Sequence, residues 1–522
     1  MTVIFRARAR HAALAPLAIG VFLAGGRTLA AQSATSTPSA AVRPLSLADA
    51  LRLAGAASEN VELARAGVQR ARGQQSQARA AMLPQVNSTL NWQKQLQNQF
   101  AAIASRGGGT GTGTGTGSDS STADNPITRI FASQYNFNFG LTASQPIFTG
   151  GRVAAGVRGA RFARESAELG ITSAEAQVQL DVTAAYYDAL LAERLATIAD
   201  SAFVQAERTL RQVQLTRNVG SASEFELIRA RVTRDNQRPQ LLQARTTREA
   251  ALIRLRQLLD LPATQALQLT DSIAELPSVP AAPAAPVTTV NVNVDEVLAA
   301  DPRVQSDVAR LVAASDTSAR ARAAVKQAAF GVNVAEQQLR ATKAQRFPQI
   351  SATTNYQRLA YPRNILPTSL NDFLPNWTVG IGLSYPIFTG GNIRGQITAA
   401  EATVVEARQR LKLAQEGATL DARLAALQLT EAEANWQASI GTAEQAQRAY
   451  AIAEVRFREG ISTQLELSET RVQLQQALAN RARAARDLQV ARKRIELLPY
   501  LPLSAGGAST SASASTNMGT SR

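Results

Sequence analysis

The side chains that most often carry out chemistry in proteins are nearly absent from this sequence. Its 522 residues contain no cysteine and a single histidine, His11. These counts exclude a disulfide framework, a Cys/His zinc site, a thiol nucleophile and a Ser–His–Asp triad. Serine–lysine or paired-carboxylate catalysis is possible in principle, but no motif organises the scattered acidic residues for it. We therefore expect no enzyme activity, no cofactor and no metal site.

The remaining candidates for chemistry are hydroxyls and carboxylates that follow two glycines. Each glycine permits a left-handed turn, the hydroxyl can cap a returning helix, and a carboxylate near a helix start suits the helix dipole. Turns between helices are therefore expected near 218–224 and 458–464. The first turn contains Gly220 and Ser223 and is followed by Glu226, and the second contains Gly460 and Thr463 and is followed by Glu466 and Glu469.

The N-terminus has the order of a secretory signal peptide. Basic residues precede an apolar run from Ala12 to Leu23, and small residues follow up to Ala31. This order predicts a cleaved signal over 1–31. The apolar run is too short to span a bilayer, which takes about 20 residues. We expect an exported chain whose mature form contains no histidine.

The chain contains an internal repeat. The octapeptide SQPIFTGG at 144–151 recurs as SYPIFTGG at 384–391, and this offset of 240 also separates Gly220 from Gly460. Leu-Pro-Gln at 83–85 recurs as Phe-Pro-Gln at 347–349, with an offset of 264. The first copy has a Gly/Thr-rich insert around 107–117 that accounts in size for the difference. We infer a duplication, with copies over 44–276 and 294–499 joined by a Pro/Ala linker at 277–293.

Most of the chain has the composition and periodicity of long helices. The stretch from Arg152 to Asn218 contains no proline, and as one helix it would be roughly 100 Å long. Leucines and isoleucine on seven-residue steps after 463 indicate coiled-coil packing. A linker at 32–43 precedes the helices, and a Ser/Ala-rich tail at 503–522 is expected to be disordered. The other predicted helices cover 45–81, 223–259, 294–344, 393–458 and 463–497.

Four short segments between the helices alternate apolar residues with small neutral ones. More than half of the chain's aromatic residues fall in or beside them. Each segment is about nine residues long, which suits a tilted strand that crosses a bilayer. A soluble sandwich would show similar alternation, but the export signal and the long charged helices favour a membrane barrel. The predicted strands lie at about 85–97, 135–146, 349–358 and 377–386.

Four strands cannot close a membrane barrel within one chain. An open sheet has two unpaired edges, and lipid does not tolerate them because every backbone group must be hydrogen-bonded. Several copies must therefore contribute strands to one barrel. The strand count by itself allows a dimer or a trimer.

This order of motifs, present twice, resembles the TolC-type outer-membrane efflux proteins, or outer membrane factors. The resemblance covers about 44–499 and depends above all on the doubled Pro-Ile-Phe-Thr-Gly-Gly. It implies a mainly α protein with a membrane β part. A homotrimer would form one 12-strand outer-membrane β-barrel that continues into a long α-helical coiled-coil barrel in the periplasm. The barrel would join the helices at Pro84, Pro146, Gly150, Gly151, Pro348, Pro386, Gly390 and Gly391.

The resemblance also implies a function and a site. The chain would be the passive exit duct of a tripartite system, in which a periplasmic adaptor and an inner-membrane transporter deliver drugs and other small molecules. The adaptor would dock at tips that carry Gly220, Ser223, Gly460 and Thr463, although a role in the turn alone explains the glycines equally well. A periplasmic gate would carry rings of Glu226, Glu466 and Glu469, which could instead be solvated helix-face acids.

One departure from the family pattern concerns this gate. Some members have an arginine two residues after the second glycine, which ties the gate to a neighbouring acid. Ser462 occupies that position here. Glu226 matches the acidic side of this lock, and Arg456 or Arg458 could substitute for the missing arginine.

Other functions are open on the sequence. A type I protein secretion duct would share the whole fold, and a periplasmic coiled-coil scaffold would share the helices but not the strands. The net charge of +15 could indicate nucleic acid, but the basic residues are spread along helices without a recognition motif. We interpret them as solvated helix faces with some attraction to lipid headgroups, and we expect no nucleic acid partner.

Overall fold

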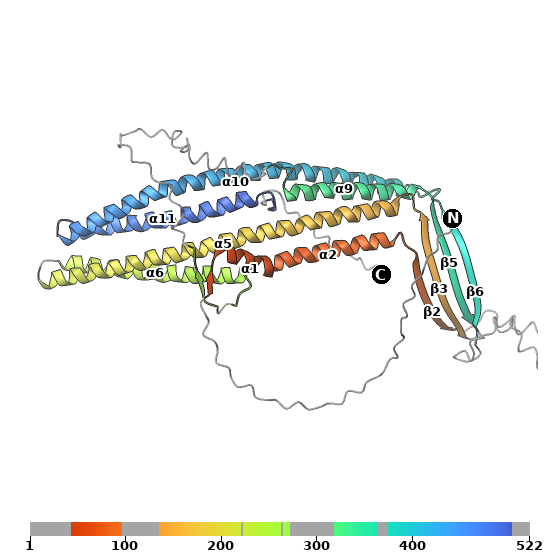
Figure 1. The fold of residues 1–522 in the computed structure, drawn as a ribbon, viewed down its shortest axis with the longest axis horizontal. Coiled ribbons are helices and arrows are strands. Elements are labelled where there is room, and N and C mark those ends of the chain that lie inside the picture. The colour runs from red at the N-terminus through yellow and green to blue at the C-terminus, as the bar shows by residue number, and fades with distance from the viewer. Residues whose placement is uncertain are drawn as a thin grey trace, which may run out of the picture.

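The protein is an elongated helical body with a β-sheet at one end and two helix turns at the other (Figure 1). The computed structural model describes residues 43–96, 135–220, 223–262, 265–271, 318–362 and 373–503. The predicted signal, nearly all of the linker at 32–43, the Gly/Thr-rich insert, the Pro/Ala linker at 277–293 and nearly all of the C-terminal tail lie outside these ranges.

Two helices of equal length run through the body. α5 (Arg152–Asn218) and α10 (Asn392–Arg458) have 67 residues each, or about 100 Å at 1.5 Å per residue. Two shorter helices lie end to end along each of them (Figure 1). These are α2 (Glu59–Ala80) and α6 (Glu224–Leu258) along α5, and α9 (Ala323–Lys343) and α11 (Gln464–Leu497) along α10.

The long helices agree with the sequence patterns, and two shorter ones differ from them. The stretch predicted as one helix over 45–81 breaks at Ser58, whose backbone is extended between α1 (Leu47–Ala57) and α2. In the described part of the helix predicted at 294–344, the first helical residue is Ala323, after an extended Arg322. None of the described helices is both long and apolar enough to cross a membrane.

The largest core lies in the middle of the body, where a small sheet joins distant segments. β1 (Arg43–Leu45) pairs in parallel with β4 (Leu267–Leu269). The hydroxyl of the buried Tyr186 lies 2.8 Å from the Asp271 carboxylate and 3.0 Å from the Leu45 carbonyl oxygen. Burial and the nearby carboxylate raise the pKa of Tyr186, so the phenol stays protonated and fastens this sheet to α5.

The larger sheet has four antiparallel strands in the order β2-β3-β5-β6. Its central strands are paired on both sides, whereas within the described residues β2 and β6 are each paired along one edge only. Pro146 lies inside β3, next to an irregularity in its pairing with β5, and Pro386 lies beyond the end of β6. The bounds are Gln85–Lys94 for β2, Tyr135–Phe148 for β3, Gln349–Ala360 for β5 and Phe373–Ser384 for β6.

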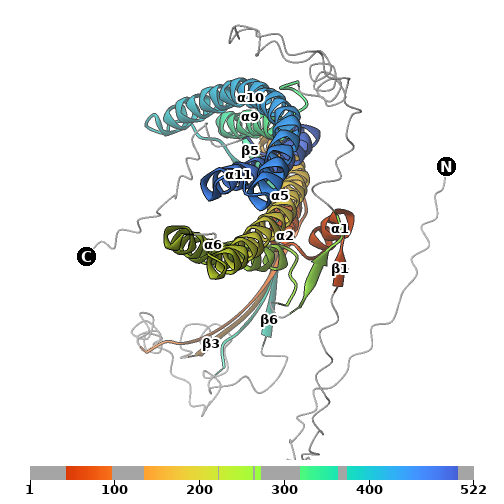
Figure 2. The ribbon, with the colours of Figure 1, turned by 90° about the vertical axis from the view of Figure 1, so that its left-hand side faces the viewer.

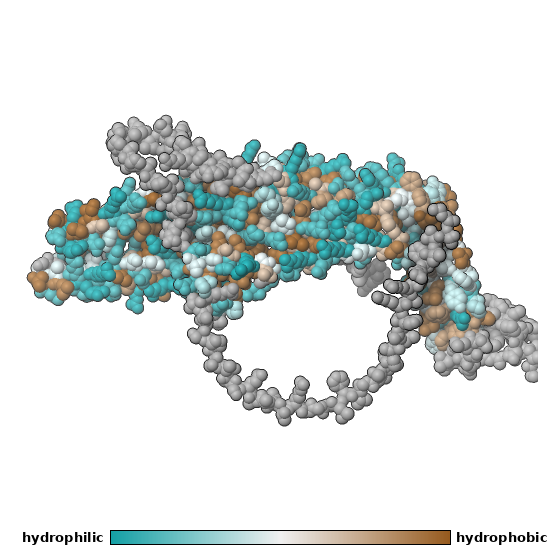
Figure 3. Space-filling view, viewed as in Figure 1, coloured by the Kyte–Doolittle hydropathy of each residue, from teal (hydrophilic) through white to brown (hydrophobic). Residues whose placement is uncertain are grey.

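The sheet exposes apolar side chains that a soluble protein would cover. Brown surface gathers over the strands in Figure 3, whereas teal dominates along the helices. From Trp377 in β6 to Tyr385 just after its end, every second side chain is large, apolar and exposed, and the residues between them are small. The sheet therefore has one apolar and one polar face. The exposed set on this strand is Trp377, Val379, Ile381, Leu383 and Tyr385.

Candidate functional site: the helix tips

Both predicted turns lie at the end of the body opposite the sheet (Figure 1). The first joins α5 to α6 and the second joins α10 to α11. Figure 2, viewed from this end, shows the two hairpins packed next to each other. We call these turns tip 1 (residues 218–226) and tip 2 (residues 456–470).

Tip 1 is a glycine turn followed by a complete helix cap. Gly220 has a φ of +80°, and its N–H donates to the carbonyl of Arg217 at 2.9 Å. The Ser223 hydroxyl oxygen accepts from the Glu226 N–H at 3.2 Å, and the Glu226 carboxylate accepts from the Ser223 N–H at 3.2 Å. This reciprocal capping box occupies Glu226 with the start of its own helix.

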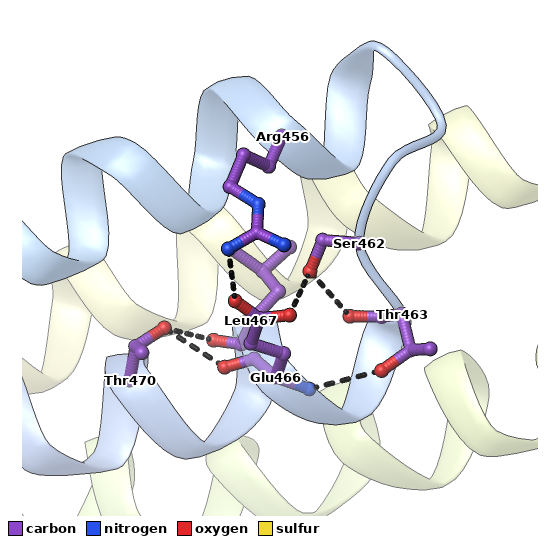
Figure 4. Close-up of polar contacts among 6 residues, drawn as sticks. All are labelled: Arg456, Ser462, Thr463, Glu466, Leu467 and Thr470. Carbon is purple, nitrogen blue, oxygen red and sulfur yellow. Dashed lines mark hydrogen bonds and ion pairs between the residues drawn. The ribbon is translucent and has the colours of Figure 1, made fainter.

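Tip 2 has the same turn but uses its carboxylate differently (Figure 4). Gly460 has a φ of +72°, and Thr463 caps α11 by accepting from the Glu466 N–H at 3.4 Å. The Glu466 carboxylate accepts a hydrogen bond from the Ser462 hydroxyl at 2.7 Å and pairs with Arg456 at 3.3 Å. The structure therefore pairs Arg456 with Glu466 of the same hairpin, and not with Glu226, the acid that matches the family's lock.

The third predicted carboxylate, Glu469, is exposed and has no ion pair in the described part of the chain. It follows Glu466 by three residues, so the two acids lie on neighbouring turns of one helix face. Tip 2 thus presents one carboxylate that is paired with an arginine, that of Glu466, and one exposed carboxylate without an ion pair in the described chain, that of Glu469.

A buried glutamine joins the two tips. With its amide oriented so that donors meet acceptors, Gln464 donates to the Glu226 carbonyl at 3.2 Å and accepts from the Ala230 N–H at 3.1 Å. Phe457 of α10 packs against apolar clusters in both hairpins. These contacts hold tip 2 against the first turn of α6.

Arg471 is a second buried polar residue of this region, and only 4% of it is exposed. Its Nε has no hydrogen-bond partner in the described chain, and burial lowers its pKa. Gln464, Leu467 and Arg471 line a cavity of about 10 Å³ between the hairpins, which is room for about one water molecule. Sequence analysis missed Gln464 and Arg471. Their spacing of three and four residues from Leu467, a seam position, is the signal that could have revealed them.

The predicted junctions between strands and helices contain paired glycines. Gly150 and Gly151 precede α5, Gly390 and Gly391 precede α10, and all four have a positive φ. A Cβ atom at Gly150 would also lie 2.8 Å from the Ala344 carbonyl oxygen and from Phe347. Pro84 and Pro348 lie where a helical segment gives way to β2 and β5.

An exposed four-stranded sheet joined to helical hairpins about 100 Å long is the architecture of a channel protomer rather than of a globular enzyme. The sequence profile of the outer membrane efflux protein family matches residues 50–260 and 314–499. Since this match covers more than half of the chain, the protein belongs to the outer membrane efflux protein family.

Known proteins similar to this chain agree with that assignment. OpmQ of Pseudomonas aeruginosa, a pyoverdine export outer membrane protein, is 26% identical over 452 residues, which cover 86% of this chain and 83% of OpmQ. The CmeC outer membrane channel of Campylobacter jejuni has a similar structure, with a TM-score of 0.64, 15% identity and 88% and 86% coverage. VceC of Vibrio cholerae is also similar in structure, with a TM-score of 0.62 and 17% identity, over 87% of this chain and 96% of VceC.

Family membership defines the class and location of the protein. It is an outer-membrane efflux channel protein that extends into the periplasm, and the family is one of ducts rather than enzymes. The predicted family, fold class and location are therefore confirmed.

Proposed function

We propose that three copies of the chain form the outer-membrane exit duct of a tripartite efflux system for small molecules. Twelve strands would make the barrel, and the helices would continue it as a periplasmic tunnel. A periplasmic adaptor and an inner-membrane transporter would deliver the cargo at the tips. Export of pyoverdine by the similar OpmQ supports a small-molecule cargo.

The observation that supports the proposal most strongly is that the two ends of the molecule differ in chemistry and lie far apart. Apolar strands that suit lipid lie at one end, and charged turns lie at the other, with helices of 67 residues between them. A duct needs this separation because it must begin at a partner in the periplasm and end in the outer membrane. A scaffold of coiled coils would not need the exposed strands.

Within this duct, tip 2 is the proposed gate. Around a three-fold axis, Glu466 and Glu469 would each form a ring of three carboxylates that attracts cations. The pairing of Arg456 with Glu466 would hold each copy of α11 against α10 in the resting state. Gly220, Ser223, Gly460 and Thr463 would shape the surface that meets the adaptor.

The glycines of the tips provide the test of function. Valine at Gly220 and Gly460 cannot adopt the positive φ found there without strain, so the double variant should deform both tips and leave the sheet intact. We expect trimers to assemble while cells accumulate a fluorescent efflux dye as strongly as cells lacking the protein. Gly441→Val is the control, because Gly441 belongs to α10 and a Cβ atom added there would meet no neighbouring atom within 4 Å. Normal dye efflux by the double variant would show that the tips do not dock a partner.

A further inference from the structure

Arg471 of α11 is a buried positive charge that the described chain does not compensate. It makes no hydrogen bond or ion pair with a described residue, and its Nε is fully enclosed. Tyr450 is the only neighbour that favours the charged form of Arg471, and burial raises the pKa of that phenol, so it stays neutral. A guanidinium does not lose its proton in proteins, and an uncompensated buried charge is strongly unfavourable. A further group is therefore needed to balance this charge.

A cavity of about 110 Å³ lies beside Arg471, between α5 and α11. One water molecule needs about 10–15 Å³ of such space, so a small ion fits there together with water. No acid of the described chain lines this cavity. Its polar lining consists of two arginines, two hydroxyls and two amides, which are Arg194, Thr197, Ser201 and Gln205 of α5, and Arg471 and Gln475 of α11.

The lining presents donors from both helices. The hydroxyls of Thr197 and Ser201 donate to carbonyl oxygens of their own helix at 3.0 and 2.9 Å, so their protons are already used. The Gln475 amide donates to Gln237 at 3.5 Å and has a second N–H to offer. The strongest donors that remain are the guanidinium groups of Arg471 and Arg194, and guanidinium groups bind anions well.

The other half of the repeat lacks this arrangement. Arg231, the equivalent of Arg471 at an offset of 240, is exposed to solvent. Asp235 occupies the position equivalent to Gln475 and pairs with Arg234 at 2.7 Å. The first half therefore has a solvated arginine and a nearby carboxylate, whereas the second half has a buried arginine and a neutral amide.

We propose that Arg471 and Arg194 bind a small inorganic anion, chloride or phosphate, in the cavity between α5 and α11. A water molecule there would accept a hydrogen bond from the Arg471 Nε but would not neutralise its charge, whereas an anion does both. Because Arg194 belongs to the first helical hairpin and Arg471 to the second, the bound anion links the two hairpins. The site lies within one chain, so it goes beyond the proposed exit duct and does not depend on it.

The thermal midpoint of the mature protein in detergent, followed by tryptophan fluorescence, tests this site. Chloride and phosphate each replace gluconate, a larger organic anion, at constant ionic strength. We expect the midpoint to rise by a few degrees with either small anion, because a ligand that binds only the folded state stabilises it. The anion that acts at the lower concentration is the preferred ligand. Wild-type protein should also broaden the NMR signal of chloride, and phosphate should reverse that broadening.

Arg471→Met is the decisive variant, and Arg231→Met is its matched control with the same loss of charge at the equivalent, exposed position. The midpoint of Arg471→Met should not respond to either anion. In gluconate it should equal or exceed the wild-type midpoint, because an apolar side chain of similar length leaves no charge buried. Arg231→Met should respond as the wild type does.

Arg194→Gln provides a second test that does not disturb a buried residue, since Arg194 is exposed. Its response should require a higher anion concentration than that of the wild type, and an unchanged concentration would overturn the two-arginine site. Equal wild-type midpoints in all three salts, or a response of Arg471→Met equal to that of the wild type, would overturn the anion site altogether. Loss of the response in Arg231→Met as well would trace it to net charge and overturn the site too.

Discussion

Glu226 and Glu466 occupy equivalent positions of the repeat, yet their carboxylates have different partners. Glu226 completes a capping box with Ser223, whereas Glu466 turns to Arg456 and Ser462. The residue 240 positions before Arg456 is Thr216, so tip 1 offers no cation at the matching place. At tip 2 the Glu466 carboxylate gains two partners, the Arg456 guanidinium and the Ser462 hydroxyl, in place of the single backbone N–H that a reciprocal cap would offer.

The Arg456–Glu466 pair should matter for the proposed gate more than for stability. Both side chains are more than 40% exposed, and such pairs contribute about 0–1 kcal/mol. We expect Arg456→Gln to raise the single-channel conductance of the protein in planar lipid bilayers and to leave its thermal midpoint nearly unchanged.

Arg458→Gln is the matched control for this prediction, since Arg458 makes the same charge change and has no ion pair in the described chain. Equal conductance for wild type and both variants would remove the pair from the gate.

At the scale of the helices, a buried ion cluster ties three of them together. Asp421 of α10 accepts from Arg322 at 2.6 Å and from Arg494 of α11 at 3.0 Å. Arg322 directly precedes α9 and is completely buried. Removing one partner of a buried ion pair typically costs about 3–5 kcal/mol, because the remaining charge is left without compensation.

Asp421→Ala should therefore destabilise the second half of the repeat strongly. The equivalent acid of the first half, Asp181, is half-buried, and in the described part of the chain it accepts a hydrogen bond only from Gln177, at 2.9 Å. We expect Asp421→Ala to cost about 3–5 kcal/mol and Asp181→Ala about 1 kcal/mol, compared by thermal unfolding in detergent. Equal midpoints for the two variants would show that the cluster does not hold the helices together.

The sequence predicts these elements unevenly, for physical reasons. α5, α10 and α11 follow from periodicity and glycine breaks, which are local signals. The pairing of β1 with β4 joins three-residue strands more than two hundred residues apart, and no local pattern encodes it. Strand ends were also shifted: the segment expected at 377–386 forms β6 from Phe373 to Ser384.

The same difference between local signals and long-range packing applies to the residues of the site. Gly220, Ser223, Gly460 and Thr463 were predictable because turn and cap chemistry is local. Gln464 and Arg471 were not, because their burial arises only when two hairpins pack together. The expectation that the basic residues lie on solvated helix faces was wrong for Arg322 and Arg471, which are buried where helices meet. The acids Asp421 and Glu433 are also buried, and each pairs with an arginine.

At the scale of the molecule, the two halves of the repeat make equivalent contacts between helices with different residues. Arg72 of α2 pairs with Glu168 of α5 at 3.7 Å, and Glu336 of α9 pairs with Arg408 of α10 at 2.9 Å. These positions are equivalent in the repeat, with the signs of the charges reversed. A contact that survives exchange of its charges indicates that the helix packing itself is conserved between the halves. Such a body can be extended around an axis by adding further copies.

The length of that body is set by α5 and α10, which separate the strands from the tips. Three copies joined edge to edge would surround a continuous passage with lipid-facing strands at one end. The proposed efflux function depends on this assembly, because the described part of one chain encloses no passage.

Electron microscopy of the mature protein extracted in detergent tests this central claim most directly. We predict single particles with three-fold symmetry, each a tube longer than about 100 Å, with a detergent belt around the strand end and a constriction at the tips. Monomeric particles, or filaments without a belted end, would contradict the account, because the strands would then serve some purpose other than a shared barrel.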